Sequence, residues 1–321
     1  MTQRTQSLCG LTFDILSRKM RQMKNKIVSA CLPSFILCSL FLLMSPVKAQ
    51  PPDRSSLINA LEKADCVVTE DGKVKICKFD YKYKTKTVEA LTFRPNTDGK
   101  FPSLFLIPGY TGTAKTYLGV GIIFAKLGFA SMSVGTPGFG KTELKPEFLG
   151  KTTINAFIEG YKKFKQESFV DKEKLGVFGY SRGAIAASLM ITRVKDVKAA
   201  VLGGGIYDLK KAYDELTIEG IKENIKAETG LTEKAFKQRS VVFRVKKINS
   251  PVLIIHGEED LNAPTNQAYL LRDKLKEAGK EFEFQIIAGH SHGNLGGNFL
   301  TIVVDFFSRK LKGVPADVKF R

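Results

Sequence analysis

The chain has 321 residues, of which 43% are hydrophobic and 26% are charged. This composition excludes an intrinsically disordered protein, and the length suits one large α/β domain behind a leader segment. The formal charge is +18, but Lys residues alternate with Glu and Asp, and there is no dense basic run with interleaved aromatic residues. We therefore expect no nucleic-acid partner, while a loose attraction to anionic polymers or membrane surfaces stays open.

An export signal is predicted over residues 1–49. Lys24 and Lys26 form a positive start, a long apolar stretch follows, and the compact side chains of Val47 and Ala49 suit the pockets of a signal peptidase. We expect cleavage after Ala49 and a periplasmic or secreted protein.

Two questions about this segment stay open. The apolar core of about 18 residues is just long enough to span a bilayer, so an uncleaved signal that anchors the protein in the membrane is the alternative to cleavage. Translation starts at Met1 or at Met23. A typical signal would begin close to Met23, which directly precedes Lys24 and Lys26.

Cys66 and Cys77 are the two cysteines beyond residue 49. An even pair in an oxidising compartment indicates a disulfide, and Asp71–Gly72 between them is typical of a hairpin turn that brings the two sulfurs together. The alternative is two unrelated buried thiols. With so few Cys and His residues we expect no metal site, and no motif indicates a cofactor.

From Phe101 onward, short continuous apolar runs alternate with longer helical patterns, which predicts a parallel sheet covered by helices on both faces. The predicted strands are Ser103–Ile107, Phe129–Val134, Leu175–Phe178, Ala199–Leu202, Val252–Ile255 and Phe282–Ile287. The predicted helices are Ala114–Leu127, Lys151–Phe169, Gly183–Arg193, Thr265–Ala278 and Phe299–Leu311.

These elements predict an α/β catalytic domain over residues 85–312. Residues 50–84 read as an N-terminal β extension, and residues 313–321 form a tail. Residues 207–247 hold only amphipathic helical patterns, which fit either a small helical cap over a site or an enlarged surface connection.

Gly179–Tyr180–Ser181–Arg182–Gly183 stands between a predicted strand and a predicted helix. A G-x-S-x-G sequence in this setting is typical of a nucleophile elbow, a sharp turn that exposes a serine hydroxyl at a helix N-terminus. The two glycines let strand and helix approach closely. Ser181 is therefore the candidate nucleophile, and a glycine-rich turn without chemistry is the alternative.

Asp260 lies in a polar loop just past the predicted strand Val252–Ile255. An acid after the nucleophile and past a strand end suits the third member of a catalytic triad, which orients the imidazole. Glu258, Glu259 and Asp208 are rivals.

His292 is the candidate base. It and His290 lie in a glycine-rich loop past the last predicted strand, and we favour His292 because Gly293 follows it. His256 stands at a strand end and reads as structural. A metal site at His290 and His292 lacks further ligands.

An oxyanion hole needs two N–H donors beside the nucleophile. The backbone N–H of Arg182 follows Ser181 directly. The second candidate is the N–H of Tyr110 in the loop Pro108–Gly112, where Gly109 allows close approach to a substrate. A plain turn after the strand is the alternative.

Together these segments resemble the α/β-hydrolase superfamily, and in particular the catalytic domain of the prolyl oligopeptidase family and the dienelactone-hydrolase-like esterases. The motifs are Gly179–Gly183, His256–Asp260 with Pro264, and Gly289–Gly293, and the resemblance covers residues 85–312. It implies an α/β-hydrolase fold and selects Asp260 and His292.

Three departures from the family's pattern stand out. Pro108–Gly109 replaces a common His-Gly, and the residues ahead of position 85 are too few for the propeller that prolyl oligopeptidases carry. In addition, Arg182 follows the nucleophile, and its charge could favour acidic substrates.

The sequence thus predicts an exported serine hydrolase that cleaves carboxylic ester bonds of a small-molecule substrate through an acyl-enzyme on Ser181. A serine peptidase or amidase of the prolyl-oligopeptidase type is the nearest alternative. A non-catalytic binding protein on a hydrolase fold is the alternative from another class. Nothing in the sequence indicates an oligomeric state.

Overall fold

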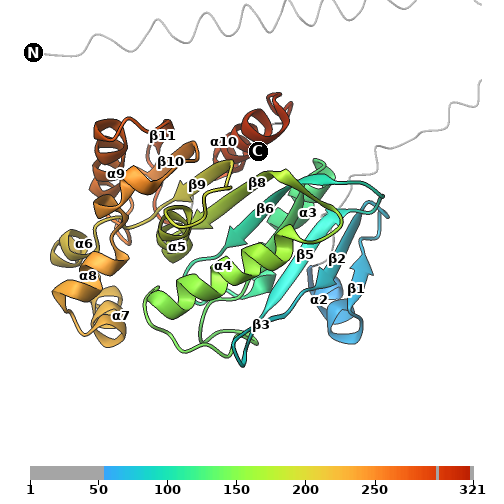
Figure 1. Ribbon diagram of the computed structural model, residues 1–321, viewed down its shortest axis with the longest axis horizontal. Helices are drawn as coiled ribbons and strands as arrows, with labels where there is room; N and C mark the ends of the chain where they lie inside the picture. Colours follow the sequence, from blue (N-terminus) through green and yellow to red (C-terminus); the bar gives the residue numbers. More distant parts are fainter. Residues whose placement is uncertain (1–53, 294–295, 319–321) are drawn as a thin grey trace, which may run out of the picture. The chain divides into compact units, whose positions relative to one another are not determined.

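The computed structural model describes residues 54–293 and 296–318 (Figure 1). The predicted export signal and the end of the predicted tail, residues 319–321, lie outside the described residues. None of the helices in the described ranges is long and apolar enough to cross a membrane.

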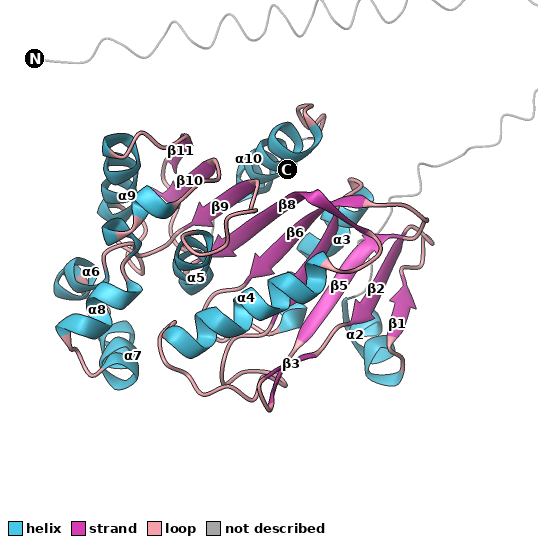
Figure 2. Ribbon diagram, viewed as in Figure 1, coloured by secondary structure: helices cyan, strands magenta, loops and turns pink. Residues whose placement is uncertain are grey.

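A nine-stranded sheet in the order β1-β2-β5-β7-β6-β8-β9-β10-β11 forms the centre of the fold (Figure 2). Strands β7, β6, β8, β9, β10 and β11 run parallel, and β5, β2 and β1 continue the sheet antiparallel to one another. A separate hairpin pairs β3 with β4. The strands are β1 (Cys66–Val68), β2 (Val74–Lys78), β3 (Tyr81–Tyr83), β4 (Lys86–Val88), β5 (Ala90–Pro95), β6 (Phe101–Ile107), β7 (Ala130–Val134), β8 (Val170–Tyr180), β9 (Ala199–Gly203), β10 (Val252–Gly257) and β11 (Phe282–Ile287).

Helices cover both faces of this sheet. The α-helices are α2 (Arg54–Lys63), α3 (Leu118–Lys126), α4 (Lys151–Lys165), α5 (Arg182–Ile191), α6 (Leu209–Glu215), α7 (Glu219–Thr229), α8 (Glu233–Arg239), α9 (Asn266–Glu277) and α10 (Gly296–Phe307). Short helical turns are η1 (Ala114–Tyr117), η2 (Val241–Phe243), η3 (Val245–Lys247) and η4 (Ser308–Lys312).

Strand β6 shows how the sequence builds the two layers. Leu104 and Leu106 belong to one buried cluster, whereas Phe105 and Ile107 belong to another, because successive side chains of a strand point to opposite faces. The first cluster packs α3 and α10 against the sheet, and the second packs α4, α5 and α9. Continuous apolar runs are therefore what a doubly covered sheet requires. The fold is the predicted α/β-hydrolase arrangement.

Residues 50–84 are not the all-β extension that the sequence predicted. They include α2, of which Leu57 and Leu61 are buried, and β1 and β2 belong to the main sheet. The remaining positions of α2 are mostly polar or small, so the helix has only a narrow apolar stripe. The helical periodicity of this segment is therefore weak in the sequence.

The predicted disulfide is present between Cys66 and Cys77. The two residues face each other in the register of the antiparallel pair β1 and β2. Gly72 has a φ of 70° in the connecting turn, where the side chain of Thr69 donates to Asp71 at 2.7 Å. The bond thus links the edge strand of the sheet to its neighbour.

Residues 207–247 fold into α6, α7 and α8 followed by η2 and η3. Figure 2 shows the three α-helices together beyond the carboxyl ends of β8 and β9, the end of the sheet where Ser181 lies. One side chain of α7, Glu228, bonds to Arg182 next to Ser181. The segment therefore contributes one side chain to the surroundings of the elbow, and its role as a cap stays a prediction.

Candidate active site

Ser181 lies at the turn between β8 and α5, with φ 57° and ψ −127°. Glycines make this turn possible. A Cβ atom on Gly183 would lie 2.0 Å from the carbonyl oxygen of Ile107, and one on Gly179 would lie 2.2 Å from the carbonyl oxygen of Gly183. Strand, turn and helix therefore pass each other at distances that only glycine allows. The side chain of Ser181 is held at the N-terminus of α5 as a nucleophile elbow requires.

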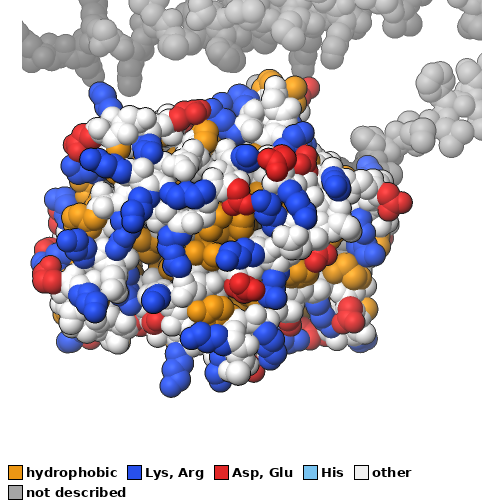
Figure 3. All heavy atoms as spheres, viewed as in Figure 1, with side chains coloured by type: hydrophobic (Ala, Val, Ile, Leu, Met, Phe, Trp, Pro, Cys, Tyr) orange, Lys and Arg blue, Asp and Glu red, His pale blue; other side chains and the backbone are white. Residues whose placement is uncertain are grey.

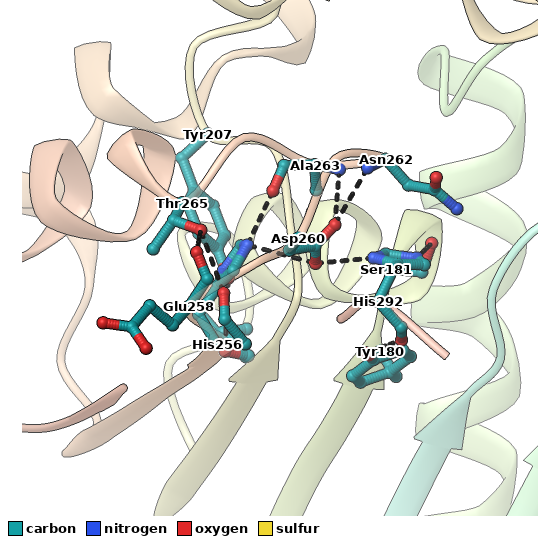
Figure 4. A network of polar contacts seen from close by, with 12 residues as sticks. Tyr180, Ser181, Tyr207, His256, Glu258, Asp260, Asn262, Ala263, Thr265 and His292 are labelled. Carbon is teal, nitrogen blue, oxygen red and sulfur yellow. Dashed lines mark hydrogen bonds and ion pairs between the residues drawn. The ribbon is translucent and has the colours of Figure 1, made fainter. Parts of the chain in front are cut away.

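The structure brings Ser181, His292 and Asp260 into one hydrogen-bonded row (Figure 4). Nε2 of His292 lies 2.8 Å from Oγ of Ser181, and Nδ1 lies 2.7 Å from Oδ2 of Asp260. With its Nδ1–H donating to the carboxylate, the imidazole has a free lone pair on Nε2 to accept the serine proton.

The Asp260 carboxylate is buried, and both of its oxygens accept hydrogen bonds. Its Oδ1 accepts the backbone N–H groups of Asn262 at 3.0 Å and Ala263 at 2.9 Å. Burial raises the pKa of this carboxyl, but hydrogen bonds from His256, His292 and the Ala263 N–H outweigh burial and lower the pKa to about 2. Asp260 is therefore ionised at neutral pH and can stabilise a positive charge on His292.

His256 belongs to the same network, which the sequence did not predict. Its side chain is fully buried. Its Nε2 lies 2.7 Å from the Ala263 carbonyl oxygen and 3.3 Å from Oδ2 of Asp260. Because a carbonyl oxygen can only accept, Nε2 carries the proton. Among the described residues Nδ1 has no hydrogen-bond partner. The sequence signals for it were its place two residues before the acidic loop and its position at the start of the motif His256–Asp260.

Tyr180 holds the His292 loop from the other side, and it too was missed. Its hydroxyl donates to the backbone carbonyl of His292, and the two rings lie 5.4 Å apart. Burial raises the pKa of Tyr180, so the hydroxyl keeps the proton that this bond needs.

The rival residues lie elsewhere. His290 is half-buried and its Nδ1 contacts the carbonyl of Ala288. Glu258 accepts the N–H of Gly289, and Asp208 accepts the Lys211 N–H as the cap of α6. The Glu259 N–H donates to the backbone of His290. Within the described ranges, no three His, Cys, Asp or Glu side chains are placed to hold a metal ion.

The loop after β6 passes directly over Ser181. A Cβ atom on Gly109 would lie 3.2 Å from Cβ and 3.6 Å from Oγ of Ser181. The N–H of Tyr110 belongs to the peptide bond that follows Gly109, and the N–H of Arg182 follows Ser181. Neither amide donates to another described residue. The peptide bond between Gly109 and Tyr110 thus lies in the loop beside Ser181, and the oxyanion role of the Tyr110 and Arg182 N–H groups stays a prediction.

The side chain of Arg182 does not present a free charge, contrary to the expectation of acidic substrates. Its Nη1 lies 2.9 Å from Oε1 of Glu228. The guanidinium also lies over the rings of Tyr110 at 4.1 Å and Phe148 at 4.3 Å. Its charge is thus already balanced within the protein, by a residue for which the sequence gave no signal.

A small, largely apolar pocket lies next to the elbow, where Arg182, the neighbour of Ser181, forms part of its wall. The space in it that a water-sized sphere can occupy is about 20 Å³, which is enough for one small group. Its lining comes from the end of β6 and the loop after it, the loop between β7 and α4, the helix α4, the first residue of α5, and α7. The lining residues are Ile107, Pro108, Tyr110, Thr136, Pro137, Phe139, Pro146, Glu147, Phe148, Leu149, Thr153, Phe157, Arg182 and Glu228.

Residues 134–313 match the prolyl oligopeptidase family. An uncharacterized peptidase of Bacillus subtilis, YtmA, is 29% identical over 211 residues, which cover 64% of this chain and 81% of that protein. The acylamino-acid-releasing enzyme 2 of Oryza sativa is 21% identical over 210 residues, but they cover 27% of that protein.

Solved structures show the same fold. The acylaminoacyl peptidase of Pyrococcus horikoshii superposes with a TM-score of 0.66 at 20% identity, over 75% of this chain and 42% of that one. An acetyl xylan esterase from Paenibacillus sp. R4 superposes with a TM-score of 0.67 at 14% identity, over 80% of this chain and 93% of that one. The chain therefore belongs to the prolyl oligopeptidase family, and it is a serine hydrolase with the α/β-hydrolase fold.

Proposed function

We propose that this protein cleaves carboxylic ester bonds of small molecules through an acyl-enzyme on Ser181. The observation that carries the proposal is the row formed by Asp260, His292 and Ser181, with contacts of 2.7 and 2.8 Å. Hydrogen-bond contact between nucleophile and base, with the base oriented by a third group, is the arrangement that activates a serine hydroxyl.

In the proposed mechanism each step falls to one group. His292 Nε2 takes the proton from Ser181 as Oγ attacks the substrate carbonyl carbon. The N–H groups of Tyr110 and Arg182 stabilise the oxygen anion of the tetrahedral intermediate. His292 then gives the proton to the leaving alcohol, and the same base activates the water that releases the acid. Asp260 stabilises the imidazolium throughout.

Peptide or amide bonds are the second candidate, which the match to a peptidase family favours. The chemistry on Ser181 is the same for both bonds. The acetyl xylan esterase of Paenibacillus shares the fold over 93% of its chain, and this likeness supports the ester as the first choice.

Export to the periplasm or the medium is a further part of the proposal. The disulfide between Cys66 and Cys77 supports it, since such bonds persist in oxidising compartments. N-terminal sequencing of the protein recovered from its native host tests the location. A mature chain that begins at Gln50 agrees with export, and a chain that retains Met1 or Met23 contradicts cleavage.

A small-molecule partner suits the pocket better than a nucleic acid does. Figure 3 shows one face of the protein, over which Lys and Arg side chains are spread among Asp and Glu side chains and do not form a single stripe. Such a surface offers no continuous track for a phosphate backbone.

Labelling with a fluorophosphonate tests the catalytic role. We expect wild type to be labelled, Ser181→Ala not to be labelled, and Ser168→Ala, at an exposed serine just before the other end of β8, to react like wild type. An unlabelled wild type would favour a non-catalytic binding protein. Rates on 4-nitrophenyl acetate and on an acyl-peptide 4-nitroanilide then separate the two candidate bonds, and faster anilide cleavage would contradict the ester preference.

A further inference from the structure

Glu228 is the one pocket-lining residue that comes from α7. Its carboxylate makes two bonds, one to the guanidinium of Arg182 at 2.9 Å and one to the backbone N–H of Phe148. Only 11% of the Glu228 side chain and 13% of the Arg182 side chain are exposed. The ion pair therefore forms part of the pocket wall, out of reach of most solvent.

Arg182 requires a carboxylate in this position. Its guanidinium is covered by the rings of Tyr110 and Phe148, and burial lowers its pKa while the charge of Glu228 opposes that change. A buried cation without a counter-ion is strongly unfavourable. The carboxylate that pairs with Arg182 also occupies part of the pocket, and this volume is not open to a substrate.

The loop that receives the second bond of Glu228 is itself fixed. Phe148 and Leu149 have φ values of 40° and 60°, and the buried side chain of Arg239 donates to the carbonyl of Phe148 at 2.7 Å. Because this wall is held from two sides, the pocket cannot easily widen to admit a longer group.

We propose that Glu228 makes the pocket next to the elbow selective for short, uncharged acyl groups. The inference rests on the proposed function and adds the substrate class. The carboxylate of Glu228 limits the length of the pocket, whose volume is about 20 Å³, and it keeps Arg182 from binding an acid group of a substrate.

Removal of this carboxylate has a consequence that a structural role alone does not predict. In Glu228→Ala the pocket lengthens and the guanidinium of Arg182 loses its partner. An acyl group that ends in its own carboxylate can then supply the missing anion. The variant should therefore gain activity on an acidic ester that wild type rejects.

The test uses 4-nitrophenyl acetate, butyrate and octanoate together with the mono-4-nitrophenyl ester of glutaric acid. We expect wild type to favour acetate over octanoate by about 100-fold in kcat/KM, since one methylene group changes kcat/KM by roughly 10- to 200-fold in a tight apolar pocket. Glu228→Ala should raise the ratio of glutarate to acetate by at least about tenfold.

Two further variants separate size from charge. Glu228→Gln keeps the length of the side chain, so octanoate should stay excluded and the glutarate ester should gain nothing. Glu228→Asp keeps the charge and shortens the side chain by one methylene group, so the preference should move from acetate to butyrate. This variant carries the test if Glu228→Ala does not fold. Glu223→Ala, an exposed position on the same helix, is the control and should retain the wild-type profile.

The inference is overturned if wild type cleaves octanoate as fast as acetate, or if neither Glu228→Ala nor Glu228→Asp changes the ratios. These outcomes differ from a failure of the proposed function, in which the wild-type enzyme neither reacts with a fluorophosphonate nor cleaves any of the four esters.

Discussion

The Nε2 atom of His256 lies 3.3 Å from Oδ2 of Asp260, the oxygen to which His292 also bonds. The same Nε2 donates to the Ala263 carbonyl in the loop that carries Asp260. His256 thus connects the end of β10 to the acidic loop and fixes the direction of the carboxylate. It acts on the reaction through another residue, as a positioning residue.

Replacement of His256 should accordingly lower kcat and leave KM unchanged. We expect His256→Leu to lose about 10- to 100-fold in kcat on 4-nitrophenyl acetate, because small displacements of a catalytic group have effects of this size. His256→Gln retains an N–H donor and should recover part of the loss. Equal kcat in both variants, or a change confined to KM, would contradict a positioning role.

His292→Ala and His290→Ala form a matched pair in one loop. The first removes the base that contacts Ser181, and kcat should fall by about 10⁴-fold or more. The second removes a half-buried ring whose Nδ1 contacts the Ala288 carbonyl, and kcat should stay within about threefold of wild type because the row is intact. Steady-state kinetics on one ester decide between them, and equal losses would show that the loop matters only as a whole.

Asp260 should give the protein an acid-sensitive contribution to its stability. The pKa of its carboxyl is lowered from 3.8 to about 2, so the contribution is complete above about pH 4 and disappears as the pH falls through 2. The shift corresponds to about 2 kcal/mol in the free energy of unfolding. Denaturant unfolding between pH 5 and pH 2 should show a steeper loss for wild type than for Asp260→Asn; parallel curves for the two proteins would argue against the shift.

The disulfide should stabilise the fold without taking part in catalysis. Cys66 and Cys77 close a short loop, with a sequence separation of 11, for which chain entropy predicts about 3 kcal/mol of stabilisation. Replacement of both by serine should lower the free energy of unfolding by that order. The kcat at 25 °C should not change, because β1 lies at the sheet edge, far in strand order from β8. A lower kcat in the fully folded variant would show an unexpected link to the site.

The fold and the hydrogen-bonded row were predictable because each depends on a local signal. Buried parallel strands need continuous apolar runs, and β11 has the same bounds as its prediction, Phe282–Ile287. The elbow around Ser181 needs its two glycines, and the family motifs select Asp260 and His292. The structure adds that these three side chains meet; their catalytic roles remain a proposal.

The rest depends on contacts between distant segments that leave no pattern in one sequence. Glu228 is one of many Glu residues on amphipathic helices, and nothing near it marks its bond to Arg182, which is 46 residues away. The sequence alone therefore gives no reason to expect that the charge of Arg182 is balanced by a carboxylate of the protein itself. His256 and Tyr180 could be placed at strand ends, but their partners Ala263 and the His292 carbonyl follow only from the folded loops.

The backbone at Ser181 has a φ of 57°. At this position the residue that is needed for activity lowers the thermal stability of the fold. A non-glycine residue pays roughly 1–3 kcal/mol to stay in such a conformation, so Ser181→Gly should melt at a higher temperature than wild type while it hydrolyses nothing. Directed evolution of this enzyme by heat challenge alone would then reward loss of the hydroxyl, and any such screen has to select for turnover at every round.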